Sequence, residues 1–520
     1  MDTRERINLG VRLFREGKQR DLIDYMRRLR QEDPLAADLL RVCVATYRSA
    51  SPEAVMIGRR LLPAVADKPE LARFLFDKLG LAYRMMGEMG ASDNWFLRAL
   101  EISEEMGDRK SESLARLCLL QNRFFRAEYE TLYPEMAEFA RSARPEHALH
   151  ARYLMAVIEI IRGKPDKAIK TLDSVSADRG LLVFDLMEMK GLAARMLGRL
   201  DDSMRLYIES TQGYADFGMA YACFPCAKAM ELSRLAGMEP PPKPLVRKCL
   251  SLARRGSWEE IAAAGEIRAL ITEDERDIPL PLLESARGYY RASQPMEAFS
   301  AGLTAAFLAW KTTSAAFAEA LKFIGPLITL YPGFRRDPLL GRFMARIEPL
   351  LEEESSQEPE GIRAYLVEGP RVFVNGNEID IRAWRSKKAA FALVYLLLSS
   401  RHGVSADHMF YLLWPKARYT KRTRQWLYDV VSFVRRALGK PNLITKRRDF
   451  YRIEDAWTDL SEIEALLRRA SASCDPAERE EILQRARELA CGELLPEMID
   501  DPYIEEHRMY YNRIRKSLGL

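Results

Sequence analysis

The sequence predicts a mainly α protein, in which a long array of paired helices precedes a small α+β module and a short helical region. Three observations predict this class. Residues 1–350 show apolar residues at helical spacing almost throughout, between turns rich in Gly, Pro and Asp. Residues 362–457 contain alternating segments that are typical of strands. Hydrophobic residues make up 48% and charged residues 30% of the 520, which excludes a wholly disordered chain.

A recurring turn divides the first 350 residues. Gly17, Gly87, Gly163 and Gly198 are 70, 76 and 35 residues apart, close to one or two periods of 34 to 38. Around the second glycine, small and aromatic residues stand where tetratricopeptide repeats have them: Gly80, Tyr83, Ala91, Phe96, Ala99 and Leu100. Each helix pair of such an array buries its apolar face only against the next pair. We therefore predict a tetratricopeptide-like α-solenoid over residues 1–350, interrupted by the proline-rich residues 239–244.

This solenoid resembles the tetratricopeptide-like sensor regions of large bacterial regulators. The resemblance implies an effector, either a small molecule or a protein, on the concave face. The aromatic and methionine side chains along the helices are expected to form the core rather than a ligand site.

The sequence contains no enzyme signature. It has no phosphate-binding G-x-x-x-x-G-K-[ST] loop, no nucleophile elbow and no H-E-x-x-H motif. His147 and His150 share a helix face without further ligands at metal spacing, so we expect surface residues and no metal. Cys223 and Cys226 lie in a helical context, which favours buried thiols over a redox or zinc pair. We expect no catalytic residue and no cofactor.

Targeting signals are also missing from the sequence. The first residues carry charges of both signs, unlike a signal peptide, and the apolar run 389–398 is too short to span a bilayer. The seven cysteines are scattered, which does not suggest a disulfide framework. We expect a cytoplasmic protein with no membrane contact.

The positive charge is concentrated near the end of the chain. An acidic linker is expected at residues 351–361, before the basic module at residues 362–457. The module holds 19 Lys and Arg against 8 Asp and Glu, whereas the rest of the chain holds 61 against 67. This distribution is typical of a nucleic-acid-binding module on an acidic body, although a solvated basic face would show it too.

The order of elements in this module can be predicted from turn and capping residues. Alternating residues around Asn375 and Gly376 indicate a β-hairpin. A buried helix follows over SKKAAFALVYLLLSS, and Ser405 is placed to cap a second helix that Pro415 stops. The segment RQWLYDVVSFVRRALG predicts a third helix closed by Gly439, and LITKRRDFYRI predicts two strands around a basic turn. Hairpin, three helices and hairpin are the order of a winged helix-turn-helix.

The segment LLWPKARYTKRTRQWLYDVVSFVRRALG with ITKRRDFYRI resembles the OmpR-like DNA-binding domain of SARP-family transcription activators. Residues 458–520 are similar to a shortened bacterial transcriptional activator domain, which is helical. The resemblance implies promoter DNA and RNA polymerase as partners, the latter at residues 416–420, and a homodimer on DNA. In that family the DNA-binding domain lies N-terminal, whereas here it follows the solenoid.

Residues for DNA contact follow from the third helix. An apolar stripe of Leu427, Val430, Val431, Val434 and Leu438 should face the other two helices. The opposite face and the basic turn then supply the DNA-binding residues: Lys421, Arg422, Arg424, Gln425, Tyr428, Asp429, Ser432, Lys446, Arg447 and Arg448. Arg can read guanine and Gln adenine, while Asp429 could accept from cytosine or pair with a neighbouring Arg. The basic turn should meet phosphates or the minor groove, and Lys387 and Lys388 are weaker phosphate candidates.

The sequence therefore favours a DNA-binding transcriptional regulator, an activator by resemblance, that senses an effector through its solenoid. The alternative is a tetratricopeptide adaptor whose basic module binds an acidic protein. Four tryptophans of the module are expected to pack rather than to stack on bases: Trp384, Trp414, Trp426 and Trp457.

Overall fold

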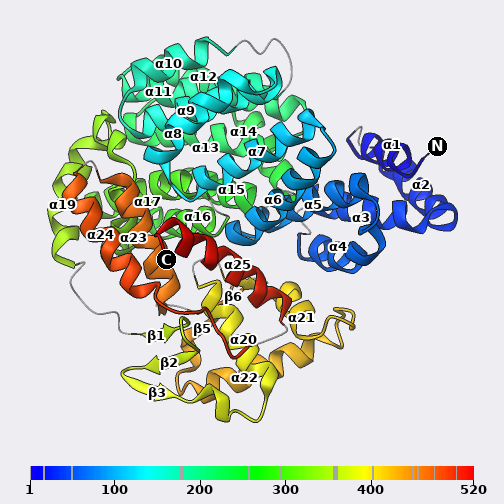
Figure 1. Cartoon of the computed structure of the whole chain (residues 1–520). Coiled ribbons are helices and arrows are strands. Elements are labelled where there is room, and N and C mark those ends of the chain that lie inside the picture. Colours follow the sequence, from blue (N-terminus) through cyan, green and yellow to red (C-terminus); the bar gives the residue numbers. More distant parts are fainter. Residues whose placement is uncertain are drawn as a thin grey trace. The chain divides into compact units, whose positions relative to one another are not determined.

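The computed structural model of the chain is mainly α, as the sequence predicts (Figure 1). It describes residues 2–15, 18–47, 51–175, 181–255, 258–292, 294–354, 361–400, 403–447, 450–453, 456–473, 475–498 and 501–520. The chain forms two compact units, one of Met1–Asn122 with Glu358–Leu520 and one of Arg123–Gln357. This division differs from the predicted domain of residues 1–350, because the first helices share a unit with the C-terminal module.

The first unit begins with helices that pack in chain order. The turn between the fifth helix (Pro69–Met85) and the sixth (Met89–Glu105) lies at Gly87, whose φ of 84° is easily adopted by glycine. Gly80 faces the ring of Phe96, where a Cβ would come within 2.8 Å, so a small residue is required as the repeat pattern indicates. Gly17 lies outside the described residues. The helices are α1 (Thr3–Arg15), α2 (Gln19–Glu32), α3 (Pro34–Tyr47), α4 (Ser51–Val65), α5 (Pro69–Met85) and α6 (Met89–Glu105), followed by α7 (Arg109–Phe125).

The second unit continues the same pattern of successive, stacked helices. Gly163 and Gly198 form the turns of two helix pairs with φ of 70° and 74°, as the spacing predicts. The helices are α8 (Tyr129–Ser142), α9 (Pro145–Ile161), α10 (Pro165–Asp173), α11 (Leu182–Met196), α12 (Leu200–Asp216), α13 (Cys223–Ala236), α14 (Lys243–Leu252), α15 (Trp258–Leu270), α16 (Pro279–Arg291), α17 (Pro295–Lys311), α18 (Ala316–Ile328) and α19 (Gly341–Glu354). Short 3-10 turns lie at Ala220–Ala222, Ala253–Arg255, Glu275–Asp277 and Pro332–Arg336.

The predicted linker at residues 351–361 begins too early. Helix α19 extends to Glu354, and Leu351 is buried four residues after the buried Ile347, so the apolar stripe of the helix continues into this segment. Residues 355–360 lie outside the described residues. The proline-rich residues 239–244 do interrupt the helices, since they cover the gap between α13 and the first residues of α14.

Two predictions for side chains of the second unit have different outcomes. His147 is buried in the first turn of α9 and His150 is half-buried, so the surface placement was wrong, because this helix buries residues on most of its faces. Cys223 and Cys226 are buried thiols in α13, as expected. The Cys223 Sγ lies 3.3 Å from the Cys249 carbonyl oxygen, and burial raises the pKa of the Cys223 thiol. A protonated, buried thiol is a poor nucleophile.

The basic module contains two small sheets, ordered β3-β2-β1-β7 and β4-β6-β5. Asn375 and Gly376, with φ of 49° and 80°, form the predicted turn, which joins β2 to β3. The short strands β4 and β7 were not predicted, since each pairs with a strand distant in sequence. The strands are β1 (Ile362–Tyr365), β2 (Arg371–Val374), β3 (Asn377–Ile379), β4 (Val404–Ser405), β5 (Ile444–Arg447), β6 (Phe450–Ile453) and β7 (Ala456–Thr458).

Three helices fill the space between these strands in the order expected: α20 (Lys387–Leu398), α21 (Ala406–Leu413) and α22 (Arg424–Ala437), with short 3-10 turns at Ile381–Ala383 and Pro441–Leu443. Ser405 caps α21 by accepting a hydrogen bond from the His408 backbone N–H at 3.3 Å. Gly439 follows α22 with φ of 69°, as a helix-ending glycine does.

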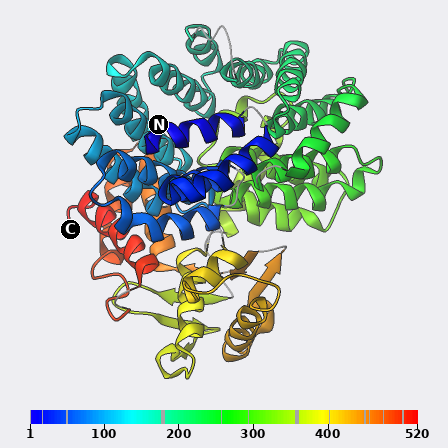
Figure 2. The same ribbon diagram turned by 90° about the vertical axis from the view of Figure 1, so that its right-hand side faces the viewer.

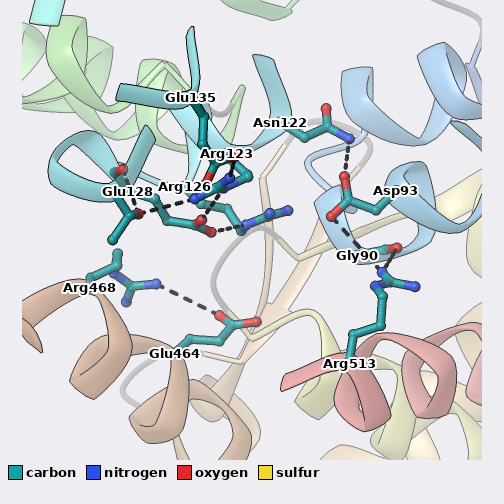
Figure 3. Close-up of polar contacts among 11 residues, drawn as sticks. Gly90, Asp93, Asn122, Arg123, Arg126, Glu128, Glu135, Glu464, Arg468 and Arg513 are labelled. Carbon is teal, nitrogen blue, oxygen red and sulfur yellow. Dashed lines mark hydrogen bonds and ion pairs between the residues drawn. The ribbon is translucent and has the colours of Figure 1, made fainter. Parts of the chain in front are cut away.

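Residues 458–520, predicted as a short helical domain, belong to the same compact unit as the basic module and the first helices. Helices α23 (Asp459–Ala472) and α24 (Pro476–Leu489) pack as a pair, whereas α25 (Pro502–Ser517) packs against α6. The Tyr510 ring covers Gly90, where a Cβ would lie 2.4 Å from it. Arg513 contacts Asn94. It also donates to the Gly90 carbonyl at 3.0 Å (Figure 3). The C-terminal helix therefore packs directly against the repeats, while its buried apolar residues belong to the core of the basic module and the first repeats have a core of their own.

Candidate nucleic-acid interface

Helix α22 is positioned by its apolar stripe. Leu427, Val431 and Val434 are buried at 2% exposure or less, and the helix packs on α20 and α21. Val430 is half-buried and Leu438 is buried, so the predicted stripe is confirmed. Because this stripe fixes the rotation of the helix, the opposite face is left to solvent.

The seven residues predicted on and just before this helix are all exposed: Lys421, Arg422, Arg424, Gln425, Tyr428, Asp429 and Ser432. Gln425 Nε2 donates to Asp429 Oδ1 at 2.9 Å, so among the described residues Asp429 pairs with Gln425 and not with a neighbouring Arg. The second N–H and the amide oxygen of Gln425 take no part in this bond. They are the two groups that a glutamine uses to read adenine.

The β5–β6 hairpin is fastened to α22 (Figure 2). Arg435 donates twice to the Ile444 carbonyl, at 2.9 and 2.6 Å. Lys446 Nζ donates to the Tyr428 hydroxyl at 3.0 Å, and this bond holds the pKa of Tyr428 below its usual value. Helix and hairpin thus present one continuous polar surface. Arg448 and the side chain of Arg447 lie outside the described residues.

Cations gather where α22 begins, although the first turn of the helix has no acidic residue. Lys416, Arg418, Lys421 and Arg422 are exposed, and among the described residues none of them has a carboxylate at ion-pair distance. The N-terminus of a helix is itself the positive end of its dipole, so this placement opposes the intrinsic preference. An external polyanion would neutralise both the side chains and the dipole.

The two weaker phosphate candidates, Lys387 and Lys388, and the tryptophans differ in how far they contact other residues of the module. Lys388 Nζ donates to the Leu413 carbonyl at 2.8 Å and lies 4.5 Å from the centre of the Trp414 ring, whereas Lys387 is exposed. Trp384 packs on Phe433, and Trp457 packs on Tyr365, as expected. Trp426 differs, since it is 44% exposed on α22 beside Trp414.

A buried polar cluster that sequence reasoning missed joins α25 to the repeats. The Glu506 carboxylate lies 2.5 Å from Arg59 and accepts from Tyr83 and Trp95 at 3.2 Å each. Burial raises the pKa of Glu506, while Arg59 opposes that rise. The apolar positions Tyr503, Ile504, Tyr511 and Ile514 at helical spacing could have indicated a buried helix face here, but not its partner.

His408 on α21 should make the stability of the first unit depend on acidity. Burial lowers the pKa of His408 to about 3, with help from Arg59, and its Nε2 has no hydrogen-bond partner among the described residues. An unfolded His binds a proton near pH 6.5 whereas the folded one does not, so stability falls as pH drops below 6.5. Between pH 7 and pH 5 we expect a loss of about 2 kcal/mol from this residue. In denaturant unfolding, the free energy of unfolding of His408→Leu should therefore fall less between pH 7 and pH 5 than that of the native chain. Parallel curves of this free energy against pH for the two proteins would contradict the prediction.

Other kinds of site find no support in the part of the chain that the structure describes. That part holds no group of three or more His, Cys, Asp or Glu side chains arranged to bind a metal ion. Nor does it include a helix with the length and apolar character needed to cross a membrane.

Comparisons with known proteins give structural likeness alone. No family model and no curated protein matches the chain. The Rap protein complexed with competence and sporulation factor is 10% identical, with a TM-score of 0.41, over 68% of this chain and 98% of that one. The TPR domain of P58(IPK) is 15% identical, with a TM-score of 0.21, over 69% and 100%. Naa15/Naa10 bound to HypK-THB is 9% identical, with a TM-score of 0.21, over 99% and 96%. At these TM-scores the likeness carries no conclusion about function.

Proposed function

We propose that this chain is a non-enzymatic, helical-repeat protein of the cytoplasm that binds a polyanionic partner through α22 and the β5–β6 hairpin, and that this partner is double-stranded DNA. One observation carries the proposal. The exposed face of α22 and the turn before it present cations and base-reading side chains, no carboxylate of the described residues pairs with Lys421 or Arg422, and a basic hairpin is held beside the helix. This is the geometry in which a recognition helix enters a major groove and a wing follows the backbone.

Within this proposal, Gln425 and Asp429 face base edges from the first half of the helix, and Arg422 does so from the turn just before it. Lys421, Arg424 and Lys446 contact phosphates, with the basic turn after Lys446 continuing the contact. The phosphate contacts fix the position on the duplex, and the base contacts select the sequence. The arrangement supports a transcription regulator whose repeats receive a small-molecule or protein effector. Contact of residues 416–420 with RNA polymerase, activation and pairing of two copies on DNA belong to the same proposal.

Gln425→Ala and Lys446→Ala should weaken DNA binding in different ways. Loss of the Gln425 amide should cost about 1–3 kcal/mol on a preferred sequence and little on others, because only a base contact is removed. Loss of Lys446 should weaken all duplexes alike and reduce the salt dependence by about one ion. Fluorescence anisotropy of the full chain with a selected and a scrambled duplex measures both effects.

The outcome that would contradict this assignment is an identical loss for both variants on every duplex. Lys446 also donates to Tyr428, itself a predicted DNA contact, so a Tyr428→Phe variant, which keeps the ring but loses the hydroxyl, measures how much of the Lys446 effect depends on this bond.

A second candidate function is an adaptor that binds an acidic protein with the same basic face. The stacked helices of both units favour it, because helical repeats commonly serve as protein-binding scaffolds. Competition separates the two candidates. If the partner is DNA, duplex should displace an acidic polypeptide such as poly-glutamate, and selected duplex should do so better than scrambled duplex. Preference for the polypeptide at equal charge concentration would favour the adaptor.

A further inference from the structure

A cavity of about 460 Å³ lies inside the first unit, where α4, α6, α21 and α25 meet. Its volume is in the range of pockets that hold small organic molecules. The four helices come from three regions of the sequence: the repeats, the basic module and the end of the chain. A molecule bound there would therefore touch both the repeats and the helix that precedes the DNA-binding helix.

Much of the wall is apolar. Val55 and Leu62 of α4, Trp95 of α6 and Leu412 of α21 line the cavity, and Met509 of α25 lies at its edge. Trp95 is almost completely buried and keeps its indole N–H on Glu506, so its ring is held in a fixed position. Such a wall suits a ring or a branched hydrocarbon.

The three carboxylates around the cavity already have hydrogen-bond or ion-pair partners. The Glu506 carboxylate is paired with Arg59 at 2.5 Å and the Glu505 carboxylate with Arg508 at 3.1 Å. Asp501 accepts from the backbone N–H groups of Tyr503 and Ile504 at 3.0 Å each, at the start of α25, and also from Tyr395. All three carboxylates on the wall therefore have internal partners.

Two guanidinium groups of the wall have no carboxylate partner among the described residues. Arg60 donates to the Pro415 carbonyl, and Arg98 reaches the Met509 sulfur at 4.0 Å and the Trp95 ring at 4.8 Å. Carbonyl, thioether and ring are weak partners for a guanidinium, which binds a carboxylate with two parallel hydrogen bonds. The cavity thus combines an apolar wall with two guanidinium groups that no described carboxylate pairs with.

We propose that this cavity binds a small amphipathic carboxylate, with the apolar body against Trp95 and Leu412 and the carboxylate on Arg98 and Arg60. The binding itself is independent of the proposed function. Its consequence for DNA rests on that function: Pro415 directly follows the last residues of α21 and begins the loop that leads to α22. A ligand that holds Arg60 away from the Pro415 carbonyl would change how this loop presents Lys421 and Arg422.

Isothermal titration of the full chain with three indoles tests the ligand class. Indole-3-acetate carries the carboxylate, indole-3-acetamide has the same ring without charge, and tryptamine carries a cation. We expect indole-3-acetate to bind at least roughly tenfold more tightly than the other two. Octanoate and 3-phenylpropionate should also bind, because they share the carboxylate and an apolar body. Failure of all three carboxylates to bind, or equal binding of tryptamine, would overturn the proposal.

Substitutions locate the site. Arg98→Gln and Arg60→Gln should each lower carboxylate affinity by roughly tenfold, whereas Arg116→Gln, at an exposed arginine paired with Glu104 and Glu112, should leave it unchanged. Leu62→Trp, which fills the cavity, should abolish binding without removing a charge. Thermal unfolding of each variant shows whether it is folded. Unchanged affinity in a folded Arg98→Gln protein would place the ligand elsewhere and reject the site.

Coupling to DNA is measured separately. The duplex affinity of the full chain should change with saturating carboxylate, and the carboxylate affinity should change by the same factor with saturating duplex. Carboxylate binding without any DNA binding would reject the proposed function while retaining the cavity. DNA binding without carboxylate binding would reject the proposed ligand of the cavity while retaining the proposed function.

Discussion

A chain with both Lys421→Gln and Arg422→Gln should bind double-stranded DNA roughly a hundredfold more weakly than the native chain at the same salt concentration. The two side chains are exposed immediately before α22, where no described carboxylate neutralises them. We expect Lys421 on a phosphate and Arg422 on a base edge. The loss of affinity therefore combines one electrostatic phosphate contact with about 1–3 kcal/mol of base recognition. Fluorescence anisotropy over a range of salt concentrations should show the slope of log K against log salt becoming shallower by roughly one to two units.

The matched control for this pair is Arg371→Gln. Arg371 is also an exposed cation of the basic module, but it lies on β2 and is already paired with Glu378 at 3.3 Å. Its loss should leave DNA affinity within about twofold, since an exposed ion pair contributes little. If Arg371→Gln weakened binding as much as the double variant, net charge and not the α22 face would be responsible.

The elements that define α22 could be predicted because local signals determine them. The stripe from Leu427 to Leu438 fixes the rotation of the helix, and Gly439 fixes its end. The turn at Asn375 and Gly376 is similarly local, since both residues adopt positive φ. Exposure of the five predicted polar residues that lie within this helix follows directly from the buried stripe.

Elements that depend on distant partners could not be predicted. The pairing of β7 with β1 joins residues more than ninety positions apart. Because β7 has only three residues, its own sequence carries no alternating pattern that would predict a strand. The docking of α25 depends on Gly90, whose missing side chain makes room for Tyr510. A glycine inside a helix indicates a close approach, but the sequence does not reveal which ring fills the space.

The same limit applies to the cavity. Arg59, Arg60 and Arg98 each look like an ordinary surface cation in the sequence, and the terminal Glu505 and Glu506 look like an ordinary acidic helix face. Only their placement in the fold shows that Glu506 is buried and paired with Arg59, whereas Arg60 and Arg98 have no carboxylate partner among the described residues. Charge pairing across three distant segments is a property of the fold, so residue spacing alone cannot give it.

In the second unit, Arg195→Met should lower the free energy of unfolding by about 3–5 kcal/mol. Arg195 is 1% exposed and pairs with Glu231 at 3.1 Å and Asp337 at 2.7 Å, both of which are fully buried. Despite burial, Arg195 and then Lys228 hold the pKa of Glu231 below its usual value. Without the guanidinium, two carboxylates stay in a dry core with Lys228 as the remaining cation near Glu231, at 3.7 Å. Hydrogen exchange of α11 and α13 peptides, with chemical denaturation, measures the loss within this unit.

Compensating substitutions decide whether uncompensated charge or lost packing causes this effect. If charge is the cause, Arg195→Met combined with Glu231→Gln and Asp337→Asn should be more stable than Arg195→Met alone, although it contains more changes. Acid should also stabilise Arg195→Met relative to the native chain, because loss of Arg195 removes the main interaction that lowers the pKa of Glu231. The carboxyl would then gain a proton on folding, and the deficit relative to the native chain should shrink as pH falls from 7 to 5. A deficit that stays constant with pH, together with additive losses in the triple variant, would show that the side chain matters for its volume and not for its charge.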